Sequence, residues 1–244
     1  MSKRAIASVA TLLLAGNLWA GDPWRNKPYN QWDEKDVRKV MTESPWVRTV
    51  SVERIWSEGG ALEAPTLGAS GSAASSEPRD ITRGAKPLTE GRPEAIFALH
   101  WASSRTIRRA QARNAVLQHR VLEADAEKFL AQEPTEYRVV VLGSDMTPFS
   151  RAAEKDLREM KEKSYLAPKK SKARLAPEHI EIERTGDGTK VLAVHFYFAK
   201  RTAAGEPTLT PEEKGAEFSC LIGKTTLKDS FEFQKMTDNQ GVDL

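Results

Sequence analysis

The first periodic pattern along the chain predicts a short helix followed by a strand. Apolar side chains recur at helical spacing, at Val37, Val40 and Met41. Asp33 suits the N-cap position, and Ser44-Pro45 ends the helix because proline disfavours the helical conformation in the residue before it. Residues 46–56 then alternate in polarity over part of their length, which is typical of a strand.

The next pattern predicts a strand, a long helix and a second strand. Residues 94–101 alternate in polarity. Ser103 or Ser104 then caps a single long helix that runs to about Gln132. Residues 137–142 are almost continuously apolar, which is typical of a strand buried on both faces. Elements in this order form a βαβ-like unit, so we expect the two strands to be parallel.

A shorter helix and two hairpins complete the predicted secondary structure. Residues 149–163 form a helix rich in alternating Glu and Lys, and a basic loop, Lys169–Arg174, follows it. From residue 179 the polarity period changes to two, and Gly186-Asp187-Gly188 separates two strand patterns, which predicts a hairpin. The strands of the second hairpin are expected at residues 217–222 and 226–235.

Two stretches without these patterns set the domain boundaries. Residues 1–20 hold a basic start, an apolar run and a small residue, Ala20, before the expected cleavage point, which predicts a signal peptide. The apolar run is shorter than the ~20 residues that a membrane-spanning helix needs, so we expect no stable membrane span after signal removal. An uncleaved anchor is the alternative. Residues 57–93 are rich in Gly, Ala, Ser and Pro and predict a disordered linker.

The rest of the chain is expected to build one α+β domain. Its main body, residues 94–244, holds a mixed, mostly antiparallel sheet with a long helix and a shorter helix packed on one face. The N-terminal segment, residues 21–56, docks onto this body as a helix and a strand. With 244 residues, 39% of them hydrophobic, the chain is long enough to bury one sizeable core.

The segment KPYNQWDEKDVRKVMTESPW, residues 27–46, resembles the opening of a family of uncharacterised exported bacterial proteins. These proteins share a leader, a KPYxQW-type opening, a short helix and an SPW step into a strand. Residues 97–113 and 217–233 are similar to their strand with a basic helix and to their final hairpin. The resemblance implies an exported protein of this architecture. Because the family has no assigned activity, it implies no catalytic residues.

Charge and cysteine content narrow the classes of function. The whole chain has a formal net charge of +3, and loss of Lys3 and Arg4 with the leader leaves +1. This charge is too small for a dedicated nucleic-acid protein, so we expect no nucleic-acid partner. Cys220 is the only cysteine, which excludes an intramolecular disulfide, and we expect it to be buried and unreactive. The histidines form no metal-binding motif, and we predict neither a metal nor a cofactor.

One loop lies where catalysis would be possible. Gly143–Met146 follows the third predicted strand, and ligands gather at the carboxyl ends of strands in open α/β sheets. His100 and His195 lie in predicted strands and could converge across a sheet. Ser144, Asp145 and His195 are therefore the candidate catalytic residues of a small periplasmic hydrolase. The alternative is an ordinary turn with core or edge histidines.

Aromatic and basic side chains are the candidate ligand-binding residues. Trp32 and Trp46 either form an exposed platform for a sugar or peptide or pack the N-terminal segment onto the core. Arg109 and Arg113 belong to the arginine-rich start of the long helix, which together with Lys169–Arg174 could bind an anionic polymer. The acidic residues that follow on the same helix favour a solvated, salt-bridged surface instead.

Together these patterns predict an exported protein, periplasmic or secreted, that lacks a convergent catalytic motif. We expect a non-catalytic binding or structural module of the cell envelope, whose partner is another envelope protein or a polymer. The hydrolase and the anionic-polymer hypotheses are the alternatives, and each depends on how the chain brings its candidate residues together.

Overall fold

The structure, a computed structural model, describes residues 21–53, 94–150, 154–222 and 225–244. The predicted leader, residues 1–20, and the predicted linker, residues 57–93, lie outside the described residues. The last residues of the first predicted strand lie outside them as well.

The first half of the chain alternates helices with three strands. Its elements are α1 (Pro23–Asn26), η1 (Tyr29–Gln31), α2 (Glu34–Glu43), β1 (Val47–Glu53), β2 (Glu94–Trp101), α3 (Arg105–Leu117), α4 (Glu123–Ala131) and β3 (Glu136–Gly143). The second half is mostly strand. Its elements are α5 (Thr147–Ser150), α6 (Glu154–Lys163), β4 (Tyr165–Pro168), β5 (His179–Arg184), β6 (Val191–Ala199), η2 (Pro211–Glu213), β7 (Gly215–Ile222), β8 (Thr225–Glu232), β9 (Thr237–Asp238) and β10 (Gly241–Val242).

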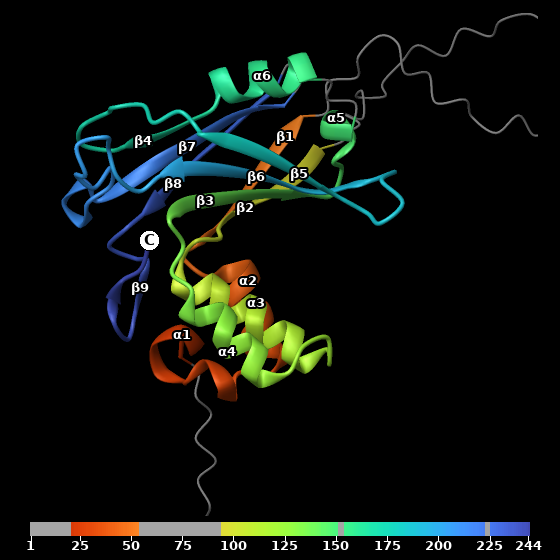
Figure 1. The fold of residues 1–244 in the computed structure, drawn as a ribbon, viewed down its shortest axis with the longest axis vertical. Helices are drawn as coiled ribbons and strands as arrows, with labels where there is room; N and C mark the ends of the chain where they lie inside the picture. The colour runs from red at the N-terminus through yellow and green to blue at the C-terminus, as the bar shows by residue number, and fades with distance from the viewer. Residues whose placement is uncertain (1–20, 54–93, 151–153, 223–224) are drawn as a thin grey trace, which may run out of the picture.

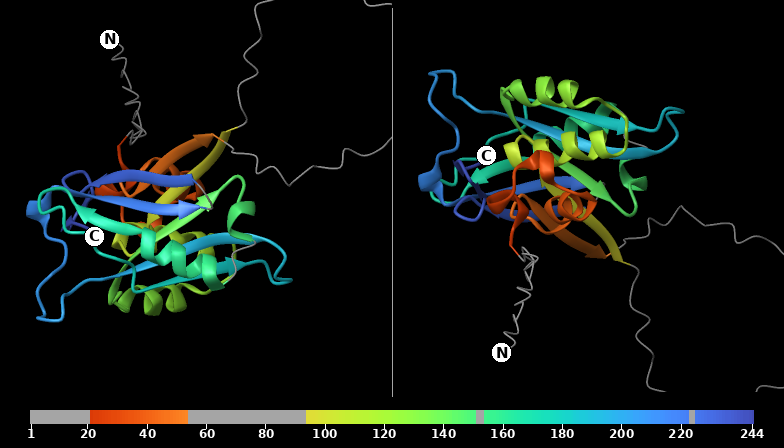
Figure 2. Two further views of the ribbon diagram at one scale, coloured as in Figure 1. Left: turned by 90° about the horizontal axis from the view of Figure 1, so that it is seen from above. Right: turned by 90° about the horizontal axis from the view of Figure 1, so that it is seen from below.

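The strands form two antiparallel sheets, which confirms the predicted α+β domain. The larger sheet has five strands in the order β1-β2-β3-β6-β5, and the smaller sheet has the order β4-β7-β8. Figure 2 shows the order of the larger sheet from orange β1 at one edge to cyan β5 at the other. A short ribbon of β9 and β10 ends the chain. The predicted hairpins are confirmed as β5–β6 and β7–β8.

The prediction that the strands before and after the long helix are parallel is wrong, because this helix is two helices. α3 ends at Leu117, and His119 adopts a left-handed backbone conformation with φ 55°. The chain then turns back along α4, so it returns to the end of the sheet that it left. β3 therefore pairs with β2 in the antiparallel sense, with Leu99 opposite Val141. Ser104 caps α3 as predicted, since its Oγ accepts the Ile107 N–H at 3.2 Å.

The main core lies between the two sheets, so the smaller sheet covers the inner face of the larger sheet. Aromatic rings from both sheets meet edge to face, with centroids 5.1 Å apart for Trp101 and Phe231 and 5.2 Å apart for Phe196 and Phe218. Such pairs add to the stabilisation from apolar burial. Figure 1 shows the helices at the ends of this sandwich, α1 to α4 at one end and α6 at the other.

The N-terminal segment and the C-terminus both pack against the start of α3. Trp46 is fully buried, lies edge to face with Trp24, and donates its indole N–H to the Asp243 carbonyl at 2.8 Å. The Asp243 carboxylate accepts the backbone N–H groups of Arg105 and Thr106 at 2.7 and 2.9 Å. These are free amide groups of the first helical turn, which a carboxylate stabilises. Both ends of the described chain therefore anchor α3.

Other local predictions have mixed outcomes. The helix cap at Asp33 is confirmed, and Asp36 completes a capping box with it. The helix predicted at residues 149–163 is divided into α5 and α6, with residues 151–153 outside the described part. The sequence patterns missed β4, which pairs with β7.

Candidate functional site

The loop after β3 holds its serine and aspartate in backbone contacts. The Ser144 N–H donates to the Ile96 carbonyl at 2.9 Å, and the Ser144 Oγ accepts the Ile96 N–H at 3.2 Å. The Asp145 Oδ1 accepts the Thr147 N–H at 3.0 Å, at the start of α5. These contacts are those of a turn that continues the pairing of β3 with β2.

The third candidate catalytic residue, His195, lies far from this loop. In the sheet His195 is opposite Val140, four residues before Ser144. Because a strand rises about 3.4 Å per residue, the two candidates are on the order of 13 Å apart along the strand direction. The His195 Nε2 lies 3.1 Å from an oxygen of Glu183 on the neighbouring strand. The structure thus does not bring Ser144 and His195 together.

His100 and His195 do lie on the same face of the larger sheet, on either side of Val140. We call this face, which points away from the smaller sheet, the outer face. Burial lowers the pKa of His100 to about 4, so this side chain is neutral at pH 7. A neutral, buried histidine separated from its counterpart by a valine is a packing residue.

Towards the β5 edge, the outer face carries an ordered group of polar side chains. The His179 ring stacks on the Tyr197 ring, with centroids 4.1 Å apart and planes at 11°. The Tyr197 hydroxyl donates to Glu181 at 2.7 Å. Burial raises the pKa of Tyr197, Glu181 raises it further and Arg138 opposes the shift, which places Arg138 beside this hydroxyl. Ring stacking and a hydrogen bond between these side chains therefore hold the group in position.

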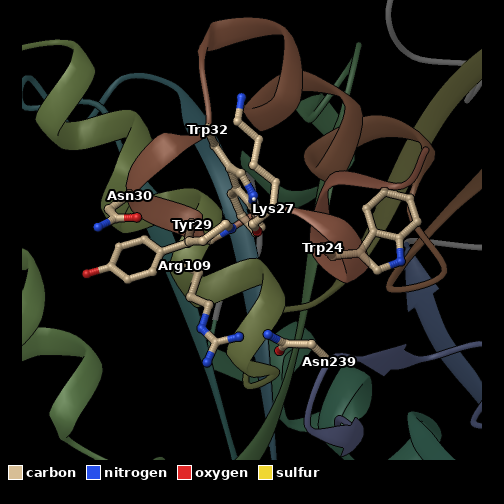
Figure 3. A pocket seen from close by; sticks show the side chains of 8 residues that line it. Trp24, Lys27, Tyr29, Asn30, Trp32, Arg109 and Asn239 are labelled. Carbon is tan, nitrogen blue, oxygen red and sulfur yellow. Dashed lines mark hydrogen bonds between the residues drawn. The ribbon is translucent and has the colours of Figure 1, made fainter. Parts of the chain in front are cut away.

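Two hollows of similar size adjoin α3, and the first lies beneath the N-terminal segment (Figure 3). This N-terminal hollow has a volume of about 240 Å³. It is lined by Trp24, Lys27, Pro28, Tyr29, Asn30, Trp32, Arg109 and Asn239. Two of the predicted ligand-binding residues, Trp32 and Arg109, therefore meet here. Trp32 is only 2% exposed, so its ring offers no open platform.

The charged groups around the N-terminal hollow already have partners within the protein. The Arg109 Nη1 lies 3.1 Å from Asp238, and Arg105 holds the other oxygen of the same carboxylate at 3.0 Å. The Asp238 side chain is fully buried. Arg113, which is not part of the lining, donates its Nε–H to the Trp32 carbonyl at 2.8 Å. The core-packing interpretation of Trp32 and Trp46 is confirmed by their burial.

The second hollow, the sheet hollow, has a volume of about 250 Å³ and opens on the outer face of the larger sheet. The loop before α3, the end of α4, the turn after it, and β3 and β6 form its walls. The residues that carry its chemistry are Ser103, Arg108, Phe129, Glu133, Arg138 and Tyr197. Tyr197 connects the hollow to the ordered polar group described above.

Arg108 is a buried cation within the wall of the sheet hollow. It is 6% exposed, its guanidinium carbon lies 4.7 Å from the Phe129 ring centroid, and its Nη2 donates to the Phe129 carbonyl at 2.5 Å. Burial lowers the pKa of Arg108 and Arg138 lowers it further, whereas Asp243 and Glu133 oppose the shift. Within the described ranges, no carboxylate oxygen lies within 4.0 Å of the guanidinium nitrogens of Arg108 or Arg138.

Ser103, in the lining of this hollow, has a buried hydroxyl without a hydrogen-bond partner in the described chain. Ser103 is 3% exposed, and its Oγ makes no hydrogen bond to any part of the chain that the structure describes. Buried polar groups are nearly always hydrogen-bonded, so such an atom next to a hollow indicates a place for a ligand or water. Ser103, Arg138 and Tyr197 were not among the predicted site residues. A signal existed for Arg138, which is the only charged residue in the apolar stretch YRVVVL.

The basic loop Lys169–Arg174 lies apart from the arginines of α3, at the β4 end of the sandwich (Figure 1). The backbone N–H groups of Lys170 and Ser171 donate to Glu213 at 2.8 and 3.0 Å. Arg174 packs over the Tyr165 ring at 4.3 Å. The structure therefore does not join this loop and α3 into one basic surface.

Several other features bear on the chemistry. Burial strongly raises the pKa of the Cys220 thiol, so this cysteine is an inert part of the core. Among the residues described, no three or more His, Cys, Asp or Glu side chains form a group that could hold a metal ion. The same part of the chain contains no helix of the length and apolarity needed to cross a membrane.

Comparison of the chain with models of protein families, with curated proteins and with solved structures found no match.

Proposed function

We propose that this protein is an exported, non-catalytic binding module of the cell envelope, and that its ligand binds in the sheet hollow. The observation that carries the proposal is the polar lining that β3 and β6 supply through Arg138 and Tyr197. On β5, beside the hollow, His179 stacks on the Tyr197 ring and Glu181 accepts its hydroxyl, which holds Tyr197 in position. Ligand sites typically combine such fixed polar groups with aromatic walls. Export is proposed from the predicted leader and from the resemblance of residues 27–46 to exported proteins.

The hydrolase alternative receives less support from the geometry. It needs Ser144 within hydrogen-bond reach of a histidine base. The Ser144 hydroxyl instead accepts a backbone N–H of β2, and His195 lies several residues away along the sheet. The closest polar partner of His195 is Glu183.

The anionic-polymer alternative also receives less support, because it needs one continuous basic surface. Arg105 and Arg109 bind the buried Asp238, and Arg113 binds a backbone carbonyl. These three arginines are therefore paired with groups of the protein itself. The loop Lys169–Arg174 lies at another end of the molecule and does not extend them into one basic surface. The positions of the charged side chains therefore fit a small ligand in the sheet hollow better than they fit an extended anionic polymer.

Blocking each hollow separately tests the proposed binding site. Thr135 is an exposed residue in the lining of the sheet hollow, and Asn239 is its counterpart in the N-terminal hollow. Three proteins without the leader would be compared: the native sequence and the variants Thr135→Trp and Asn239→Trp. Each would be screened by thermal shift against amino acids, sugars, organic acids and phosphate esters. We expect at least one class to raise the melting temperature of the native chain and of Asn239→Trp but not of Thr135→Trp.

Three results would overturn the proposal. A ligand that is lost in Asn239→Trp and kept in Thr135→Trp would move the binding site to the N-terminal hollow. The absence of any ligand among the classes tested would remove the proposed binding function. Hydrolysis of chromogenic ester, peptide or glycosidic substrates by the purified chain, with loss of activity in Ser144→Ala or His195→Ala, would support the hydrolase alternative.

A further inference from the structure

We infer that the sheet hollow binds a free carboxylate group, which is held between Arg108 and Arg138 with Ser103 as a hydroxyl donor. The inference rests on the proposed function and specifies the chemistry of its ligand. The carboxylate can belong to a small organic acid or to the C-terminus of a peptide. The two sources share the same recognition chemistry, and the experiment below separates them.

The first argument is that the positive charge of the buried Arg108 side chain has no close carboxylate partner. A buried cation is costly unless an opposite charge accompanies it. Arg108 has a carbonyl and an aromatic ring as its closest partners, and a second guanidinium, Arg138, lines the same hollow. Both guanidinium groups lack a carboxylate within ion-pair distance among the described residues. An anion in the hollow would give both arginines a partner at ion-pair distance, which Glu133 and Glu136 of the same lining do not provide.

The second argument is the match between the hydrogen-bond donors and a carboxylate. Guanidinium groups present planar pairs of N–H donors that fit carboxylate oxygens, and such charge-assisted bonds are the stronger kind. The Ser103 Oγ is buried, unpartnered within the described chain and part of the same lining, so its O–H is available as a further donor. Three donor-bearing residues from three different segments thus line one hollow.

The third argument concerns which anion the hollow selects. Glu133 and Glu136 also line it, and Glu133 is exposed whereas Arg108 is buried. The formal charges of Glu133 and Glu136 balance those of Arg108 and Arg138, so the lining as a whole offers no net attraction that would favour a doubly charged phosphate over a carboxylate. Phe129 and Tyr197 provide ring surfaces for an apolar body attached to the carboxylate. An organic acid or a peptide end fits these features better than inorganic phosphate does.

Calorimetric titration of the chain without its leader tests this inference at constant ionic strength. The probes are benzoate, benzamide as its neutral counterpart, inorganic phosphate, and an N-acetylated tripeptide with either a free or an amidated C-terminus. We expect benzoate or the free-acid peptide to bind, and benzamide and the amidated peptide to bind at least about tenfold more weakly because they lose the charged hydrogen bonds. Phosphate is expected to bind more weakly than the preferred acid because it has no apolar body to contact Phe129 and Tyr197. Preference for benzoate identifies a small acid, and preference for the peptide identifies a C-terminus.

Substitutions locate the binding and give it a matched control. Arg138 is half-buried on β3, so Arg138→Gln is expected to leave the protein folded. This substitution should weaken binding about tenfold to a hundredfold. Arg120→Gln removes the same charge from an exposed position and is expected to leave binding unchanged. Arg108→Gln serves as a second variant whose folding is checked by its melting curve.

The outcomes separate this inference from the proposed function. Equal binding of the acids and their neutral counterparts, or unchanged binding in Arg138→Gln, overturns carboxylate recognition. If another ligand class still requires the open hollow, as shown by its loss in Thr135→Trp, the proposed function stands while this inference falls. If no ligand depends on the open hollow, both fall. Tighter binding of phosphate than of either acid overturns the selectivity argument and with it the assigned ligand class.

Discussion

The two hollows beside α3 differ in what their arginines contact, although their volumes are nearly the same. Arg109 reaches the N-terminal hollow and pairs with Asp238, whose carboxylate it shares with Arg105. Arg108, the residue before it, reaches the sheet hollow and has a carbonyl and a ring as partners. The N-terminal hollow is therefore a joint between chain segments. In the sheet hollow, by contrast, the two guanidinium groups have no carboxylate at ion-pair distance among the described residues, although Glu133 and Glu136 share the lining.

The comparison shows how little sequence distance separates a structural arginine from a candidate binding arginine. Successive residues of an α-helix point about 100° apart, so neighbouring side chains enter different surroundings. One side of α3 faces the C-terminal ribbon and its buried Asp238, and the adjacent side faces the outer face of the larger sheet. The role of each arginine is thus set by the carboxylates that the fold places nearby.

The largest expected effect concerns the joint formed by the N-terminal segment. Trp46→Ala removes a fully buried ring that contacts Trp24 and bonds to the Asp243 carbonyl. We expect a loss of about 3–5 kcal/mol in the free energy of unfolding, measured by denaturant titration. Trp46→Phe keeps most of the apolar volume and loses the indole N–H, so it should cost clearly less. A Trp46→Ala chain as stable as the native chain would show that this ring does not hold the segment in place.

The second expected effect tests whether the centre of the outer face is dry, in contrast to the sheet hollow beside it. The pKa of His100 is about 4 in the folded protein and about 6.5 in the unfolded chain. The unfolded state therefore takes up the proton first on acidification, and the stabilisation present above pH 6.5 is lost as the pH falls toward 4. We expect this loss to amount to about 3 kcal/mol.

His100→Leu isolates that contribution from the carboxylates that also titrate in acid. The difference in unfolding free energy between pH 7 and pH 4 should be smaller in the variant than in the native chain, when both are measured by denaturant titration. An identical pH dependence in the two chains would mean that His100 is hydrated in the folded state. The outer face would then be open to water well beyond the sheet hollow.

Much of the fold followed from local patterns, because local physics determines those elements. The Asp33 cap, the Ser104 cap and the hairpin around Gly186-Asp187-Gly188 depend on residues close in sequence. The break between α3 and α4 did not follow from a local pattern, because His119 adopts a left-handed conformation in a stretch without glycine or proline. Because of that break, β3 pairs with β2 in the antiparallel sense and not in the expected parallel one.

The candidate site was harder to foresee than the fold. The composition of α3 indicated arginines of interest and led to Arg109 and Arg113, but both bind other parts of the protein. Selecting Arg108 requires knowing where Asp238 lies, and that residue is 130 positions further along the chain. Arg138 was open to detection as a charge in an apolar strand. The partners that decide each role are long-range contacts, which a local pattern does not contain.

The smallest expected effect on stability, and the sharpest test of the comparison, comes from two neighbouring substitutions. Arg109→Met leaves the buried Asp238 with Arg105 alone and should cost about 1–2 kcal/mol, less than a fully buried pair because Arg109 is partly exposed. Arg108→Met removes a buried cation that lacks a carboxylate partner and should change stability by less than about 1 kcal/mol in either direction. Titration with benzoate should give the opposite ranking, because binding requires Arg108 and does not require Arg109. If Arg108→Met proves the more destabilising change while binding survives it, the two hollows would exchange roles, and Arg108 would be the structural residue.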